Sequence, residues 1–117
     1  MEGPMTADAA LAELLDVSTH LRSVALMDSA GHVLAELGAV GADSAAFWAA
    51  ADTAAGQLGR PSVSQCEVGL PDANVFGVRE QGLSAIAVTD TDVTAGLVFY
   101  DLRETLRSLS GGFDARG

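Results

Sequence analysis

Few residues of this chain have the types and spacing that chemistry requires. Asp90, Thr91 and Asp92 form a short acidic group, and clustered carboxylates of this kind can bind a metal ion. The further acidic positions and the closing Glu of a calcium-binding loop do not follow them, so we expect no metal. The group is better suited to the start of a helix, where unpaired N–H donors favour negative side chains.

Groups that could act as a nucleophile, acid or base are isolated from one another. His20 and His32 are far apart in the fold expected below, and Cys66 has no basic neighbour in the sequence to activate its thiol. Three arginines could stabilise a phosphoryl-transfer transition state, but nothing in the sequence positions them: Arg60, Arg79 and Arg103. The chain has no lysine, which excludes the P-loop of nucleotide hydrolases. We therefore expect a protein that is not an enzyme and that holds no cofactor.

Charge and composition narrow the range of partners. The 117 residues carry a formal net charge of −10, so nucleic acid and anionic membranes are disfavoured, while a basic protein surface would be attracted. A hydrophobic fraction of 49% supports a packed core, and the length fits one domain. One cysteine, with no signal-like or membrane-spanning run in these residues, predicts a cytoplasmic protein.

Hydrophobic periodicity predicts three helices and five strands. The helices are expected over residues 7–17, with Thr6 as the cap, and over residues 44–58 and 92–109. The strands are expected, in chain order, over residues 23–28, 32–37, 62–68, 74–79 and 83–89. The domain core would then cover residues 7–109, and residues 110–117 would form a flexible tail.

Two of the strands lack a polar face. Residues 24–27, Val-Ala-Leu-Met, are apolar without a break, and residues 83–89 carry apolar or small side chains on both faces. Such strands lie in the middle of a sheet that helices cover on both sides. The more polar strand at residues 62–68 is typical of a sheet edge. The order α-β-β-α-β-β-β-α thus predicts an α+β fold, a five-stranded antiparallel sheet with helices on both faces.

The middle helix also predicts a contact surface. Its core-facing stripe is expected to contain Phe47, Ala51, Ala54 and Leu58, and its opposite face carries small residues that let two helices approach closely. Trp48 and Ala55 lie on the shoulder of that face and would be exposed in a single chain. Exposed apolar patches usually mark contacts, so the helix predicts an interface between protein chains. The alternative is that Trp48 folds against the sheet of its own chain and that the alanines only fill the helix.

The order and lengths of these elements resemble the roadblock (dynein light chain-type) domain family, in its bacterial branch. The resemblance covers about residues 9–109. It rests on the Leu-rich first helix, the hairpin VALMDSAGHVLAE, the Ala-rich middle helix, the strand LSAIAV and the helix that begins TAGLVFYDLRETL. Roadblock domains form homodimers or heterodimers in which the middle helices pack side by side and the third strands pair edge to edge. The bacterial domains resemble regulatory partners of Ras-like small GTPases.

The resemblance implies a homodimer that binds a Ras-like small GTPase across the paired middle helices and that could stimulate GTP hydrolysis. The dimer interface is expected to include Ala45, Ala49, Val63, Ser64, Gln65 and Cys66. The GTPase-binding residues are expected to be Trp48, Asp52, Ala55 and Gly56.

Two other functions stay open at this point. A ligand-sensing domain of the PAS or GAF kind would need a polar-lined cavity between sheet and helices, whereas the aromatic-poor interior favours close packing. A scaffold of the dynein light chain kind that binds no GTPase is not separated from the first function by the sequence.

Overall fold

The computed structural model describes the backbone of residues 6–60 and 62–114, and the side chains of these residues up to Ser110. In this part of the chain the fold consists of three helices, one short 3-10 helix and five strands. Their order along the chain is α1 (Ala7–Val17), β1 (Leu21–Met27), β2 (Val33–Leu37), η1 (Val40–Asp43), α2 (Ser44–Gln57), β3 (Gln65–Gly69), β4 (Asn74–Glu80), β5 (Leu83–Thr89) and α3 (Ala95–Asp114).

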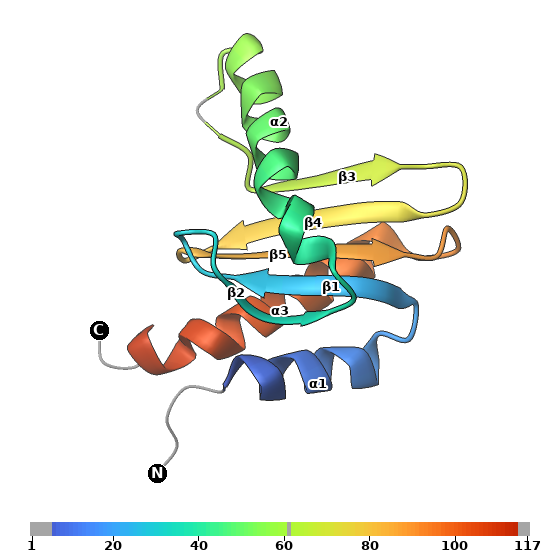
Figure 1. Ribbon diagram of the computed structural model, residues 1–117, viewed down its shortest axis with the longest axis vertical. Coiled ribbons are helices and arrows are strands. Elements are labelled where there is room, and N and C mark those ends of the chain that lie inside the picture. The colour runs from blue at the N-terminus through green and yellow to red at the C-terminus, as the bar shows by residue number, and fades with distance from the viewer. Residues whose placement is uncertain (1–5, 61, 115–117) are drawn as a thin grey trace.

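All five strands form one antiparallel sheet in the order β2-β1-β5-β4-β3. Figure 1 shows α1 and α3 on one face of this sheet and α2 on the other. The predicted α+β fold is therefore confirmed, including the central positions of β1 and β5 and the edge position of β3.

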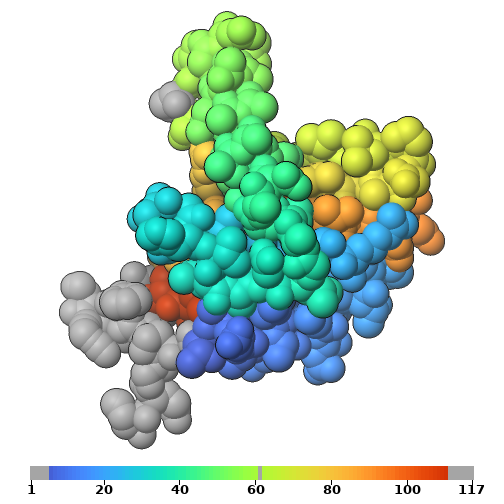
Figure 2. Space-filling view, viewed as in Figure 1, coloured from blue at the N-terminus to red at the C-terminus, as the bar shows by residue number. Residues whose placement is uncertain are grey.

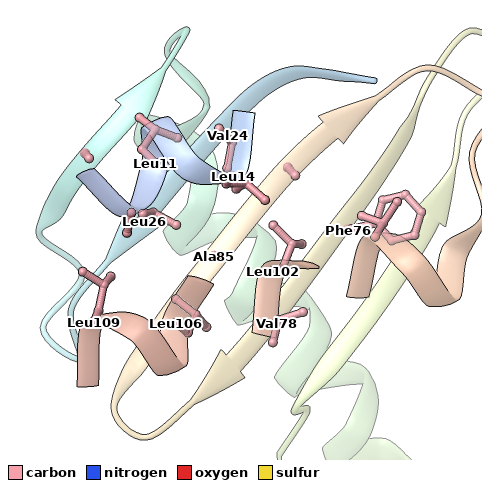
Figure 3. Packing of buried hydrophobic residues seen from close by; sticks show 14 residues of the cluster. Leu11, Leu14, Val24, Leu26, Phe76, Val78, Ala85, Leu102, Leu106 and Leu109 are labelled. Carbon is pink, nitrogen blue, oxygen red and sulfur yellow. The ribbon is translucent and has the colours of Figure 1, made fainter. Parts of the chain in front are cut away.

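The larger core lies between the sheet and the pair α1 and α3. Leu11 and Leu14 of α1 meet Leu102 and Leu106 of α3 over side chains of the central strands (Figure 3). The predicted stripe of α3 is confirmed, because its four members are all buried: Val98, Leu102, Leu106 and Leu109. Leucines at this spacing cover one side of a helix, so burial of that side fixes the helix on the sheet.

The unbroken apolar run of β1 is explained by cover on both faces. Val24 and Leu26 belong to the core under α1 and α3, whereas Ala25 and Met27 join Ile86 in a second cluster beside η1 and α2. All four β1 side chains are at most 1% exposed, so no face of this segment meets water.

Asp28 organises the hairpin that follows β1. Its Oδ1 accepts hydrogen bonds from the backbone N–H groups of Ala30 and His32, both at 2.9 Å. Gly31 has φ +89°, a left-handed conformation that glycine adopts without strain. The hydrogen bond from His32 N–H, and more weakly that from Ala30, lowers the pKa of the Asp28 carboxyl. The D-x-x-G hairpin read from the sequence is confirmed.

Element boundaries differ from the prediction by more than two residues only in β3 and α3. β3 begins at Gln65, three residues later than expected, because the backbone N–H of Val63 donates to the Asp52 carboxylate of α2 and not to a strand. α3 begins at Ala95 and continues to Asp114, so residues 110–114 of the expected flexible tail are helical. Residues 115–117 of that expected tail lie outside the described part of the chain.

Candidate functional site

The α2 helix crosses the strands and continues past the outer edge of the sheet. In Figure 1 its second half stands clear of β3, the edge strand, and Figure 2 shows it as a green column with the face of β3 uncovered beside it. The projecting part ends in Leu58, which is 78% exposed. Most other exposed residues of α2 are small: Ala45, Ala46, Ala49, Ala50, Thr53, Ala54 and Gly56. A helix that overhangs its own sheet leaves this surface available to another chain.

β3 supplies a free edge beneath the overhang. Within the described residues it pairs only with β4. Cys66 and Val68 are opposite Gly77 and Val75, which places both side chains on the α2 face of the sheet. Val68 is 42% exposed, and Val75 and its cross-strand neighbour Val88 are only partly buried. An unpaired edge beside an apolar patch is a surface that a second strand can extend.

A three-residue cluster attaches α2 to the sheet. The Arg79 guanidinium donates to both carboxylate oxygens of Asp52, with N–O distances of 2.9 Å, and its Cζ lies 4.1 Å from the centroid of the Trp48 ring. Asp52 also accepts from the backbone N–H of Val63 at 3.2 Å, and Arg79 donates to the Val63 carbonyl at 3.1 Å. These bonds connect α2, β4 and the segment before β3, and a bidentate pair of this kind has a defined geometry.

Arg79 lowers the pKa of its partner, Asp52. The hydrogen bond from Arg79, with a smaller contribution from the Val63 N–H, lowers the pKa of the Asp52 carboxyl below its usual range. Asp52 is therefore ionised at neutral pH and is already bound within its own chain. Burial raises the pKa of the Cys66 thiol, so this cysteine is not an activated nucleophile.

Gly77 makes the space in which α2 rests. A Cβ atom at this position would lie 2.7 Å from Cε2 of Phe47 and 2.9 Å from Cζ2 and Cη2 of Trp48. The two rings themselves meet edge to face, with centroids 5.3 Å apart. The absent side chain on β4 therefore lets two aromatic rings of α2 lie directly on the sheet.

The predicted orientation of α2 is wrong. Trp48 and Ala55, expected as an exposed shoulder, are only 6% and 7% exposed, whereas Ala54 and Leu58 of the expected core stripe are exposed. Alanines occur on every side of this helix, so the hydrophobic pattern of the sequence does not identify one buried face. The space over Gly77 and the pairing with Arg79 fixed the rotation instead.

The other predicted site residues are divided between surface and interior. Ala45, Ala49 and Gly56 lie on the exposed side of α2, and Ser64 and Gln65 are exposed at the start of the edge strand. Val63 and Cys66 are partly buried, and Asp52 is occupied by Arg79.

The roles of Arg79 and Gly77 in positioning this surface were not predicted from the sequence. Arg79 was considered only as a catalytic group, and Gly77 was not considered. The sequence does contain a signal for them. A glycine and an arginine lie two positions apart in a predicted strand, so both lie on the same face of the sheet, where large apolar residues are usual.

A pocket of about 500 Å³ lies beside the first turn of α2. Its walls come from the β1–β2 turn, the β4–β5 turn, and the side chains of Trp48 and Arg79. The indole Nε1 of Trp48 is buried and has no hydrogen-bond partner within the described residues. Because the pocket is bounded largely by turns at the end of the sheet, it differs from the cavity between sheet and helices that a PAS or GAF sensor would need.

Two further features bear on the class of protein. Among the residues that the structure describes, no group of three or more His, Cys, Asp or Glu side chains could hold a metal ion. In the same part of the chain, no helix combines the length and hydropathy needed to cross a bilayer.

Comparisons with known proteins identify the architecture. No family profile matches the chain, and no curated protein matches its sequence. Among solved structures, Myxococcus xanthus MglB matches with a TM-score of 0.76 and 15% identity, over 94% of this chain and 89% of that chain. A Roadblock/LC7 domain from Streptomyces avermitilis matches with a TM-score of 0.73 and 17% identity, over 86% of this chain and 91% of that chain. The gliding protein MglB from Thermus thermophilus gives 0.72 and 20% identity, over 90% of this chain and 86% of that chain.

These likenesses extend over most of the chain and most of each matched structure, so they show a shared fold. The resemblance drawn from the order of elements in the sequence is thereby confirmed at the level of fold. This chain has the roadblock fold.

Proposed function

We propose that this protein is a non-catalytic regulatory or scaffold subunit that forms a homodimer and binds a Ras-like small GTPase. The observation that carries the proposal is the overhang of α2 past the free edge of β3. The fold shared with MglB structures and the GTPase-regulating role implied by the sequence resemblance support the choice of partner.

A two-fold arrangement would satisfy both open surfaces at once. If two copies paired their β3 edges, the projecting half of each α2 would lie over the uncovered apolar patch of its partner. Val68, Val75 and Val88 would then lose their contact with water, and Leu58 would find an apolar neighbour. A surface patch that is complementary to itself in this way is typical of two-fold dimers.

The small residues of α2 would set how closely the two helices approach. Ala45, Ala49 and Gly56 present no bulky side chain, so the two backbones could pack with a short interaxial distance. The paired helices would form a platform for the GTPase. In this proposal Trp48 and Ala55 act from the interior, and Asp52 acts through its pair with Arg79, by fixing the orientation of α2 on its sheet.

Sedimentation of the purified chain tests the dimer. We expect a particle of twice the 11.9 kDa chain mass at micromolar concentration. Ala49→Arg places a long charged side chain on the exposed face of α2 and should shift the particle toward the monomer, because two copies would meet like charges there. Ala12→Arg, on the exposed side of α1, is the matched control and should leave the dimer intact. A monomeric wild-type chain would contradict the proposed assembly.

The GTPase is tested separately with a Ras-like protein encoded beside this gene. We expect a complex on size-exclusion chromatography with the GTP-loaded form, and a change in the rate of GTP hydrolysis when the chain is added. A complex without any change in hydrolysis would assign a scaffold role, and no complex with either nucleotide state would remove the GTPase from the proposal.

A further inference from the structure

A groove runs between α1 and α3, on the sheet face opposite α2. It consists of two hollows of about 500 Å³ and about 260 Å³. Val17 and Asp101 line both, so the hollows adjoin each other along the seam of the two helices. The proposed dimer and GTPase surfaces involve α2, on the other face of the sheet (Figure 1), so binding in the groove would not depend on either of them.

Three large, exposed apolar side chains line this groove. Val17 is 69% exposed, Leu97 is 63% exposed and Tyr100 is 59% exposed, and all three line one of the two hollows. They lie outside the buried stripes of α1 and α3, so packing of this chain does not use them. Large apolar groups gathered around a concave surface indicate a site of contact.

Carboxylates surround the apolar side chains. Glu13, Asp16, Asp92, Asp101 and Glu104 line the groove, and Glu104 alone of these takes part in an ion pair within the described residues, with Arg107. The lining includes no arginine, and its one histidine, His20, lies beside Asp90.

Among the described residues, the arrangement of basic side chains leaves most of this charge uncompensated. α1 contains no basic residue, and the arginines of α3, Arg103 and Arg107, are directed toward Glu80 at the end of β4. Burial raises the pKa of the Asp101 carboxyl, as expected for a charged group without a cationic neighbour. The carboxylates come from α1, from the segment before α3 and from α3, so the charge is spread along the groove.

We propose that this groove binds a basic amphipathic helix of another protein. An apolar stripe on that helix would cover Val17, Leu97 and Tyr100, and Arg or Lys side chains on either side of the stripe would meet the carboxylates. The charge of the groove disfavours nucleic acid and anionic lipid. A second copy of the chain does not suit it, because α1 and α2 contain no basic residue and the two arginines of α3, Arg103 and Arg107, are already paired with glutamates.

A synthetic helical peptide is the probe. It carries Leu at positions i, i+3, i+4 and i+7 and Arg on both flanks, and its binding to the full chain is measured by fluorescence anisotropy. A peptide of the same composition with the apolar residues scattered around the helix is the control. We expect saturable binding of the first peptide and at least about tenfold weaker binding of the second, since the scattered peptide cannot cover the apolar side chains while pairing its charges.

Charge-matched variants locate the site. The double variant Asp16→Asn with Asp101→Asn should weaken binding by about three- to tenfold, which is the effect of losing two surface charge contacts. Asp43→Asn with Asp72→Asn removes the same charge away from the groove and should have less than about half of that effect on the free energy of binding. Tyr100→Ser should also weaken binding, whereas Leu70→Ser, at another exposed apolar position, should not.

Equal losses in the two double variants, or equal binding of the two peptides, would show attraction by net charge alone and would overturn the proposal. The Ala49→Arg variant should still bind the peptide. Failure of the dimer and failure of the groove are thus separate results.

Discussion

At the scale of single residues, Trp48, Arg79 and Asp52 determine how α2 lies on the sheet. The guanidinium lies over the indole ring and pairs with the carboxylate, so one cation serves both an aromatic and an acidic partner. Trp48 and Asp52, which the sequence resemblance places among the GTPase-binding residues, both have partners within their own chain. A substitution at either one would alter the surface of α2 through its orientation.

The pH dependence of stability isolates the Asp52 contribution. Its pKa is lower in the folded chain than its ordinary value of 3.8, so the stabilisation is fully present above that value and is lost as pH falls through the folded pKa. Asp52→Asn should therefore lower the free energy of unfolding at pH 7 and have little effect near pH 2. Urea unfolding followed by the fluorescence of Trp48, the single tryptophan, measures the difference.

Asp43→Asn is the matched control, since the Asp43 carboxyl pairs with no arginine within the described residues. The remaining carboxylates are the same in the wild type and in both variants, so their titration cancels in the comparison. A difference between wild type and Asp52→Asn that stays constant from pH 7 to pH 2 would mean that the pair with Arg79 does not stabilise the fold.

At the scale of elements, the contact between α2 and β4 depends on a missing side chain. Gly77 lies under Phe47 and Trp48, and an added Cβ would approach both rings more closely than real Cβ atoms do. The helix must then move outward or rotate. Because the overhang of α2 defines the proposed dimer surface, this one position couples the packing of a chain to its assembly.

Gly77→Ala should lower the stability of the chain by about 1–3 kcal/mol, the usual cost of overpacking a core site. The emission of Trp48 should shift to longer wavelength as its ring gains contact with water. Gly96→Ala is the control, because a Cβ there meets no atom within 4 Å and alanine favours a helix. Unchanged stability and unchanged emission of Gly77→Ala would show that α2 does not depend on this space.

At the scale of the whole molecule, charge distinguishes the proposed interactions. Each chain carries −10, so a homodimer carries −20 and its halves repel at long range. The proposed dimer contact is made by small and apolar residues, whereas the groove between α1 and α3 is acidic. Added salt should therefore weaken binding of the basic peptide to the groove but should not weaken the homodimer.

Raising the ionic strength from about 0.05 M to 0.5 M shortens the range of electrostatic interactions to a few ångströms. The dissociation constant of the homodimer should stay constant or fall, because repulsion between the halves is screened. That of the basic peptide should rise several-fold. Sedimentation and anisotropy in the same buffers measure both. A dimer that dissociates in high salt would indicate that charge pairs hold it together, contrary to the apolar contact proposed.

The sequence by itself determined the architecture, because alternation in the strands and leucine spacing in α1 and α3 are local patterns with one consistent solution. Continuous apolar runs in β1 and β5 required cover on both faces, and the D-x-x-G hairpin fixed the turn between β1 and β2. The tertiary structure alone decided the rotation of α2. An alanine-rich helix has almost equal hydrophobicity on every side, so its buried face was chosen by a distant glycine that leaves room for two rings and by a distant arginine that pairs with Asp52. Such a choice depends on contacts between residues far apart in the chain, and no periodicity within the helix records them.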